Sequence, residues 1–438
     1  MANESLNRPS FSELVRVSAR IGCLSFGGPV GQIALMHREL VEERRWVEED
    51  EYLQALNLCH LLPGPEAQQL ATWIGWKLHG WRGGIAAGAL FVIPGALIML
   101  ALSMLYAAAA DLAWFSAVFL GIKAAVLAII AQALVRIASR ALKTLVQRLL
   151  AVAAFVALFL FDAPFPVVVL AALAIGAVVG ARRPELLALA TSASTNPGHP
   201  SPWGATARAV AVWLAVWAAP MVAVLLTVGR DHVLWDIGVF FSQLAMVTFG
   251  GAYAVLAYLA QEAVSGFGWL GAGEMVDGLG LAETTPGPLI MVTQFVGYLA
   301  ALRAPGSLNP IVAGILGAGL TTWVTFAPCF LWIFAMAPWM DRIQRAPALK
   351  GGLAGVTGAV VGVIANLALW FALHVLFAQV TVVSAGPIRL QWPDAASFDW
   401  RAAAIAAVAA LLIFRLKRGV VATLAVTAAM GWALGALT

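Results

Sequence analysis

The chain has 438 residues, of which 62% are hydrophobic and 11% are charged. A soluble globular protein needs a polar surface around its core, so this composition excludes that class and predicts a membrane protein. The formal net charge is only +4, and the cations lie mainly in short loops between apolar runs, which is a sign of membrane topology rather than of nucleic-acid binding. The stretch 1–20 has no apolar segment before a small-residue cleavage site, so no cleaved signal is expected.

Runs of about 20 apolar residues are long enough to cross the hydrocarbon core of a bilayer. We predict an all-α polytopic membrane protein of about thirteen spans, over 12–37, 52–79, 83–108, 113–139, 147–161, 165–181, 207–228, 237–260, 274–301, 309–337, 350–381, 400–414 and 418–437. If the N-terminus is cytoplasmic and every span crosses, 18 of the 26 Lys and Arg residues face the cytoplasm, Lys123 lies within a span, and seven face outside, namely Arg38, Arg44, Arg45, Arg230, Arg303, Arg389 and Arg401. This asymmetry predicts a cytoplasmic N-terminus and a periplasmic C-terminus.

A linker rich in turn formers, 184–206, divides the chain near its midpoint, and the parts on either side repeat one another. Two motifs recur 223 positions on: Phe26-Gly27-Gly28 as Phe249-Gly250-Gly251, and Pro63-Gly64-Pro65 as Pro286-Gly287-Pro288. The repeat begins at the first and again at the eighth predicted span, and this odd separation predicts halves of inverted topology, 1–183 and 207–438. Inverted repeats are the architecture of many secondary transporters, which bind substrate near the midplane between the repeats.

The recurring motifs interrupt two predicted helices in each half. A Pro-Gly-Pro triplet lacks two backbone donors and cannot lie in a continuous helix. A helix that restarts after the break exposes free N–H groups and the positive end of its dipole at membrane depth, an arrangement that suits an oxyanion, although a simple packing kink is the alternative. With Lys123, the candidate substrate-binding residues are Phe26, Gly27, Gly28, Pro63, Gly64, Pro65, Glu66, Phe249, Gly250, Gly251, Thr285, Pro286, Gly287 and Pro288.

Few ionisable residues lie within the predicted spans. Lys123 is in the middle of one, and its repeat partner is Thr357. A lone ammonium at this depth is costly, so Lys123 is expected either to face a substrate dianion or to form a structural pair with Glu66 or Glu283.

Three residues beside the Pro-Gly-Pro triplets, His60, Glu66 and Glu283, are candidates for proton coupling because each can change charge during a transport cycle. For Glu66 the alternative is a carboxylate held at a helix N-terminus. Polar residues also flank the breaks or lie at matching depths, and they either line a hydrophilic path or cross-link helices: Asn57, Gln68, Gln69, Gln132, Thr284, Thr285, Gln294 and Asn366.

The sequence offers no support for an enzyme. It has no Walker motif, no His-X-X-Glu-type metal spacing and no nucleophile elbow, so no catalytic residue, metal or cofactor is expected. Cys23, Cys59 and Cys329 lie in apolar segments and are interpreted as packing residues.

At these motifs the sequence resembles the chromate transporter family. The resemblance lies in the runs from Ser25 to Glu39 with Trp46, from Leu61 to Ala67, from Thr248 to Leu256 and from Ala282 to Leu289, and it covers nearly the whole chain apart from the linker. The two halves match the family's long, fused form. One departure is Ala257, where the family's Leu-Pro-Tyr pattern has proline.

The resemblance implies a bacterial inner-membrane transporter that exports chromate and confers chromate resistance, driven by the membrane potential, a proton gradient or exchange. Sulfate is isosteric with chromate and is a natural competitor or counter-substrate, so the expected partners are chromate, sulfate, protons and the lipid bilayer, with no nucleic acid. A transporter or exchanger of sulfate or another oxyanion, an anion channel and a non-transporting membrane scaffold are the alternatives. The oligomeric state is open, a homodimer being one option.

Overall fold

The computed structural model describes residues 8–25, 28–109, 112–188, 203–249, 252–343 and 346–435. Within these residues the chain is almost entirely helical, as predicted, and forms two compact units. Unit 1 comprises 1–103, 192–252 and 285–346, and unit 2 comprises 104–191, 253–284 and 347–438. Each unit draws on both sides of the linker. The repeat boundaries 1–183 and 207–438 therefore stay a prediction about the sequence.

Unit 1 holds the elements that contain both Pro-Gly-Pro breaks. Its elements are α1 (Phe11–Leu24), α2 (Gly28–His37), the π-helical turn η1 (Arg38–Glu43), α3 (Glu49–Leu61), most of α4 (Glu66–Ala109), α8 (Trp203–Thr227), α9 (Val233–Met246), η4 (Leu289–Met291), α12 (Val292–Arg303), α13 (Pro310–Met336), η5 (Ala337–Trp339) and α14 (Met340–Ile343). α13 packs along α12, α8 and α9. Its start is fixed by Asn309, whose side-chain oxygen accepts from the N–H groups of Ile311 and Val312, and by Pro310 in the first turn.

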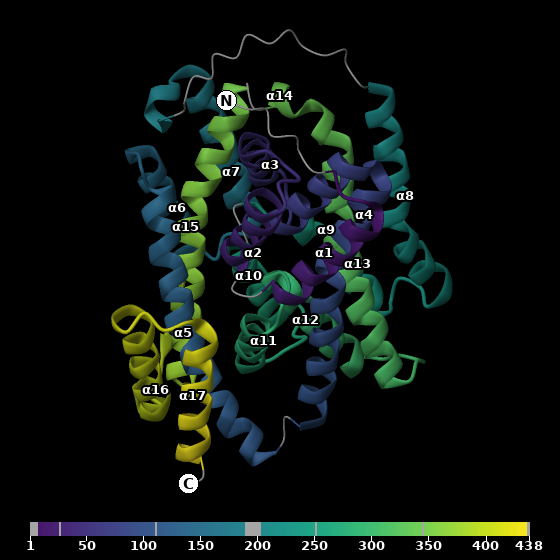
Figure 1. Ribbon diagram of the computed structural model, residues 1–438. Helices are drawn as coiled ribbons and strands as arrows, with labels where there is room; N and C mark the ends of the chain where they lie inside the picture. The colour runs from purple at the N-terminus through teal and green to yellow at the C-terminus, as the bar shows by residue number, and fades with distance from the viewer. Residues whose placement is uncertain are drawn as a thin grey trace. The chain divides into compact units, whose positions relative to one another are not determined.

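Unit 2 is built around two long helices, α5 and α15. Its elements are the end of α4, α5 (Ala113–Ala141), α6 (Leu145–Phe161), α7 (Phe165–Arg182), η2 (Pro184–Leu187), α10 (Ala252–Gln261), η3 (Glu262–Gly266), α11 (Ala272–Thr284), α15 (Pro347–Leu376), β1 (Val380–Ala385), β2 (Ile388–Pro393), η6 (Ala395–Ser397), α16 (Trp400–Ala410), η7 (Leu411–Arg415) and α17 (Val420–Gly435). α15 lies along α6 and α7, and α16 and α17 lie beside α5 (Figure 1). A β-carbon on Gly176 of α7 would lie 2.3 Å from the carbonyl oxygen of Gly351 on α15, so small residues allow this close helix contact.

Six helices in the described parts of the chain are long and apolar enough to cross a membrane: Glu66–Ala109, Trp114–Ala141, Phe165–Arg182, Trp203–Thr227, Pro310–Trp339 and Pro347–Leu376. Four shorter apolar helices accompany them: Leu145–Phe161, Val233–Met246, Leu289–Arg303 and Val420–Gly435. The multi-pass membrane architecture is thereby supported.

The structure corrects two of the predicted spans. The stretch 52–79 is two helices, α3 and the start of α4, and Glu51 and Lys77 at its two ends form an ion pair. A straight helix would hold those residues about 40 Å apart. The stretch 12–37 is likewise divided into α1 and α2, and Leu14 and Met36 from its two ends line the same small cavity. Each stretch is a hairpin of half-length helices, because the break between its helices reverses the chain.

The predicted span 350–381 is also corrected at its end. α15 ends at Leu376, and the β-branched run from Val380 forms an antiparallel hairpin with β2, in which Val380 pairs with Pro393 and Ala385 with Ile388. The sequence analysis did not anticipate this hairpin.

The helix breaks themselves are present where they were predicted, and local structure recurs at the same 223-residue offset. The order helix, helix, π-helical turn, helix occurs as α1, α2, η1, α3 and again as α9, α10, η3, α11. The N–H of Trp46 donates to the carbonyl of Leu40, and that of Trp269 to the carbonyl of Ala263, both at 2.8 Å.

Candidate functional site

Both Pro-Gly-Pro triplets lie in unit 1, and each is bonded to the residue that precedes a Phe-Gly-Gly motif of the other half. The N–H of Gly64 donates to the carbonyl of Thr248, and the N–H of Gly287 donates to the carbonyl of Ser25, both at 2.8 Å. Gly64 and Gly287 have φ of 116° and 102°, a backbone conformation that side-chain-bearing residues rarely adopt. The repeat thus places its two halves in reciprocal contact at the predicted breaks.

Two buried glutamines hold the triplets in this arrangement. The side-chain amide of Gln32 donates to the carbonyl of Gly287 at 2.6 Å and to that of Ser25 at 3.3 Å. The side-chain amide of Gln69 donates to the carbonyl of Pro63 at 2.7 Å. Both glutamines are fully buried. Gln69 was singled out from the sequence, whereas Gln32 was missed because it matches neither recurring motif.

A small cavity lies at these breaks, entirely within unit 1. Its lining residues are Pro29, Gln32, Pro65, Glu66, Ala67, Thr248, Pro288, Leu289 and Ile290. α4 begins at Glu66 and η4 at Leu289, so the N-terminal ends of two helical segments border it. The cavity amounts to about 10 Å³, which is roughly the room that one water molecule needs. In this conformation it is therefore closed to a tetrahedral oxyanion.

The electrostatics of the cavity are dominated by Glu66. This side chain is 7% exposed and its Oε2 atom has no hydrogen-bond partner within the described residues, while Oε1 lies 3.7 Å from Nδ1 of His60. Glu66 is the first residue of α4, where the helix dipole favours a negative charge. The arrangement fits the predicted helix-terminal carboxylate, and the exposed His60 beside it brings two of the predicted proton-coupling residues together.

Gln294 cross-links helices in the same unit, which is one of the two roles considered for the polar residues near the breaks. Its amide donates to the carbonyl of Ala96 on α4 at 2.8 Å, and its oxygen accepts from the hydroxyl of Thr322 on α13 at 3.0 Å. Thr285, which precedes the second triplet, is buried.

Lys123 belongs to unit 2. Its carboxylate partner is neither Glu66 nor Glu283, the two residues considered for a structural pair. Its Nζ atom lies 3.1 Å from Oδ2 of Asp277, a carboxylate on α11 that also accepts a 2.8 Å hydrogen bond from the hydroxyl of Tyr106. Asp277 could not be assigned to Lys123 from the sequence, because nothing in its spacing relates the two residues. Glu283 is buried on the same helix, α11.

Four of the predicted substrate-binding residues, Phe26, Gly27, Gly250 and Gly251, lie outside the described residues. Their neighbours Gly28 and Phe249 are described, and Gly28 begins α2 with φ of 71°.

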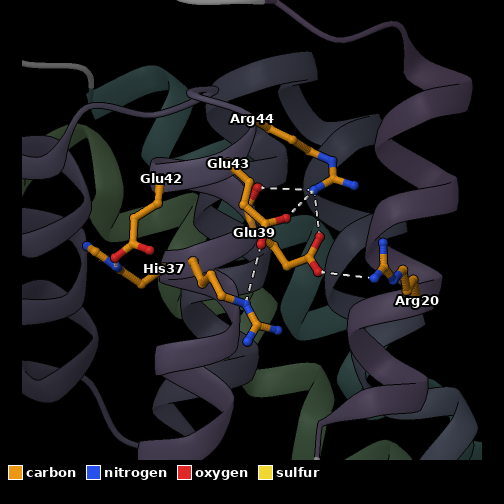
Figure 2. A network of polar contacts seen from close by, with 7 residues as sticks. Arg20, His37, Glu39, Glu42, Glu43 and Arg44 are labelled. Atoms are coloured by element: carbon orange, nitrogen blue, oxygen red, sulfur yellow. Dashed lines mark hydrogen bonds and ion pairs between the residues drawn. The ribbon is translucent and has the colours of Figure 1, made fainter.

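A charge network centred on the buried Glu39 of η1 was also missed (Figure 2). Glu39, which is 2% exposed, accepts from Nη1 of Arg44 at 2.6 Å and pairs with Nη2 of Arg20 at 3.6 Å. Its repeat partner, Glu262 in η3, is in the opposite electrostatic setting: burial and then the neighbouring Asp162 carboxylate raise the pKa of Glu262. The same position thus carries a carboxylate paired with two arginines in one half and, in the other, a carboxylate whose pKa is raised by burial and a neighbouring negative charge.

Comparison with known proteins identifies the family. Residues 12–180 and 235–432 match the chromate transporter family, which leaves out the linker and all of α8. The "Probable chromate transport protein" of Synechococcus elongatus is 31% identical over 361 residues, 82% of this chain and 83% of the relative. The "Chromate transport protein" of Cupriavidus metallidurans is 30% identical (82% of each chain), and that of Pseudomonas aeruginosa is 32% identical (81% and 79%). No solved structure matches. With both halves matched and relatives aligned over four fifths of its length, the chain belongs to the chromate transporter family.

Proposed function

We propose that the protein is a secondary transporter that exports chromate across the bacterial inner membrane and confers chromate resistance. Membership of the family supports chromate as the substrate. The observation that carries the mechanism is the reciprocal contact of the two Pro-Gly-Pro triplets, Gly64 with Thr248 and Gly287 with Ser25. It makes one site out of the two breaks, as expected for substrate binding between the repeats of a secondary transporter.

The substrate-binding residues are proposed to be those at the breaks. When the Gly64 and Gly287 contacts open, their N–H groups and those of the first turns of α4 and η4 become free donors for a tetrahedral oxyanion. The closed cavity supports this order of events, because binding requires the triplets to separate. The carboxylate of Glu66 repels a dianion, so it must take up a proton or pair with His60 in the loaded state.

Lys123 is proposed to compensate the charge of the dianion during transport, and His60, Glu66 and Glu283 remain the proposed proton-coupling residues. A cation is needed because a dianion loses its hydration on entering a protein interior. The side chain of Lys123 is 27% exposed, whereas that of its partner Asp277 is 5% exposed. This exposure supports the ability of the Lys123 ammonium to reach a second anion.

We further propose a revised topology with nine crossings, in which four pairs of half-length helices begin and end on one side of the membrane. Two of these pairs are the hairpins α1–α2 and α3 with the start of α4, and the other two are α9 with α10 and α11 with α12; the crossings are the rest of α4, α5, α6, α7, α8, α13, α15, α16 and α17. Three contacts support it: Glu51 with Lys77, Gln261 with Asp162, and Tyr106 with Asp277, each of which joins residues that thirteen crossings would assign to opposite membrane sides.

The distribution of cations also supports nine crossings. Arg38, Arg44 and Arg45 move to the cytoplasmic side, so that only Arg230, Arg303, Arg389 and Arg401 of the 26 Lys and Arg residues remain outside. The N-terminus stays cytoplasmic and the C-terminus periplasmic, and α1 and α9 still begin on opposite sides, which keeps the repeats inverted.

Uptake of radiolabelled chromate into inverted vesicles, with and without an imposed pH gradient, tests the proposal. Secondary export predicts uptake that saturates and responds to an imposed gradient or potential. Uptake that only follows the chromate gradient and does not saturate would identify an anion channel. Inhibition by sulfate, or faster uptake into sulfate-loaded vesicles, would identify sulfate as competitor or exchange partner.

A further inference from the structure

The Tyr106–Asp277–Lys123 cluster in unit 2 has no charged counterpart at the positions that the sequence repeat relates to Asp277 and Lys123. By the sequence repeat, the counterparts of Asp277 and Lys123 are the neutral Gln54 and Thr357. Gln54 lies in α3 and Thr357 in α15, which are regular helices like α11 and α5. These helices therefore form without an ion pair at the corresponding positions, so the cluster serves something other than helix formation.

The two partners differ in their freedom. Asp277 is 3% exposed, its Oδ2 atom is occupied by Lys123 and Tyr106, and its Oδ1 atom has no hydrogen-bond partner within the described residues. The Lys123 side chain is 27% exposed at the end of a flexible stem. Gly273 keeps the space beside it open, since a β-carbon there would lie 3.3 Å from the ammonium. The ammonium can therefore turn toward another anion, whereas the carboxylate cannot follow it.

Without Lys123, the carboxylate of Asp277 would be a buried charge with no counter-ion. This is strongly unfavourable unless Asp277 takes up a proton. We infer that Asp277 binds one proton whenever Lys123 turns from it to the transported oxyanion, so that proton and oxyanion are bound together. The proton adds to Oδ1, the one oxygen without a partner, and converts the carboxylate to a carboxylic acid while Lys123 stays charged. This inference rests on the proposed role of Lys123 in oxyanion transport and adds a coupling residue to it.

Few other groups could take that proton. The charged or titratable groups that face Asp277 are Lys123 on α5, Tyr106 on α4 and Glu274 on α11 itself. Of the other helices packed against α11, α15 carries Lys350 and His374 near its ends, and α17 has no ionisable residue between Val420 and Gly435.

The test measures the stabilisation of the purified protein against heat by sulfate between about pH 6 and pH 9. Sulfate remains a dianion throughout this range, whereas chromate itself takes up a proton near neutral pH. If one proton binds with each oxyanion, the apparent affinity of the wild type falls about tenfold for each unit of pH above the midpoint of Asp277. Asp277→Asn imitates the protonated carboxylate, so its affinity is expected to be high and to lose the tenfold dependence per unit of pH that this proton contributes.

Two further variants keep the result interpretable. Lys123→Met/Asp277→Asn leaves no charge at this cluster, so it is expected to fold and to lose sulfate binding. Asp162→Asn, which removes an exposed carboxylate paired with Arg389 in the same unit, is expected to retain the wild-type pH dependence.

The outcomes separate the inference from the proposed function. A wild type stabilised by neither sulfate nor chromate at any pH would contradict the proposed function. Binding that is independent of pH in the wild type, or a pH dependence that is undiminished in Asp277→Asn, would overturn the inference and leave the proposed function standing. Wild-type binding in the double variant would show that the ion pair only joins α5 to α11.

Discussion

The backbone N–H of Gly64 donates a 2.8 Å hydrogen bond to the carbonyl of Thr248, which joins the first Pro-Gly-Pro triplet to the helix break of the other half of the chain. In the same way, the N–H of Gly287 in the second triplet donates to the carbonyl of Ser25 in the first half. The side-chain amide of Gln32 donates to the carbonyls of both Gly287 and Ser25. A substitution in one triplet is therefore expected to alter the contacts of both triplets.

Replacing Pro63, Gly64 and Pro65 together by alanine, or Pro286, Gly287 and Pro288, is expected to abolish the stabilisation of the purified protein by chromate. The change restores the missing helical hydrogen bonds and withdraws the N–H donors. A hundredfold excess of ligand over Kd stabilises by about 2.7 kcal/mol, which a thermal melt detects. If either variant keeps the full stabilisation, its triplet is a kink and the anion binds elsewhere.

Gly64→Ala alone is expected to lower the stability of the protein by about 1–3 kcal/mol. The new β-carbon would lie 2.7 Å from Sγ of Cys329, at a backbone φ of 116°. Gly80→Ala is the matched control, because Gly80 also has positive φ, 60°, but has nothing within 4 Å of a β-carbon. Equal losses in the two thermal melts would mean that backbone strain alone, and not the contact with Cys329, sets the cost.

Glu39→Gln is expected to destabilise the protein by about 1.5–3 kcal/mol, because it removes the buried carboxylate that accepts a charge-assisted hydrogen bond from Arg44 and pairs with Arg20 (Figure 2). Glu43→Gln removes a carboxylate that is 52% exposed and also pairs with Arg44, and it should cost less than about 1 kcal/mol. Thermal melts of the two variants check this. Losses of similar size would show that burial of Glu39 contributes nothing.

Lys123→Ala and Lys123→Gln are each expected to abolish chromate export while the protein still inserts into the membrane. Both remove the cation that compensates the dianion and leave the carboxylate of Asp277 unpaired. Chromate uptake by inverted vesicles and membrane abundance are measured together. Wild-type uptake by the glutamine variant would remove Lys123 from the transport mechanism.

The nine-crossing topology predicts that Glu48→Cys, in a background without Cys23, Cys59 and Cys329, reacts with an impermeant thiol reagent only from the cytoplasmic side. Glu48 lies in the exposed loop before α3, and thirteen crossings would place it in the periplasm. Arg230→Cys is the control, because both topologies place it outside. Periplasmic labelling at position 48 would restore the crossing of 12–37. A C-terminal reporter that works only in the cytoplasm is expected to be inactive in either case.

The sequence by itself determined where the helices break. Pro63, Pro65, Pro286 and Pro288 have no backbone N–H, and two prolines within three residues interrupt a helix, whereas the single prolines Pro94, Pro220 and Pro328 lie inside helices. It also determined the membrane class, the repeat and the family resemblance, since composition and a recurring register are readable without coordinates. It did not determine the direction that the chain takes after a break, and for that reason 12–37 and 52–79 were predicted to cross and instead form hairpins.

Only the tertiary structure decided which groups meet. Asp277 pairs with Lys123, Gln32 reaches Gly287, and Thr248 accepts from Gly64, although none of these partners is related to the other by the repeat. Such pairs depend on how helices that are distant in the chain pack against one another. An ammonium within the membrane can pair with any carboxylate that this packing brings close to it. The sequence predicted that Lys123 has a counter-charge, but it did not distinguish between several acidic residues. The packing of α5 against α11 places Asp277 beside Lys123.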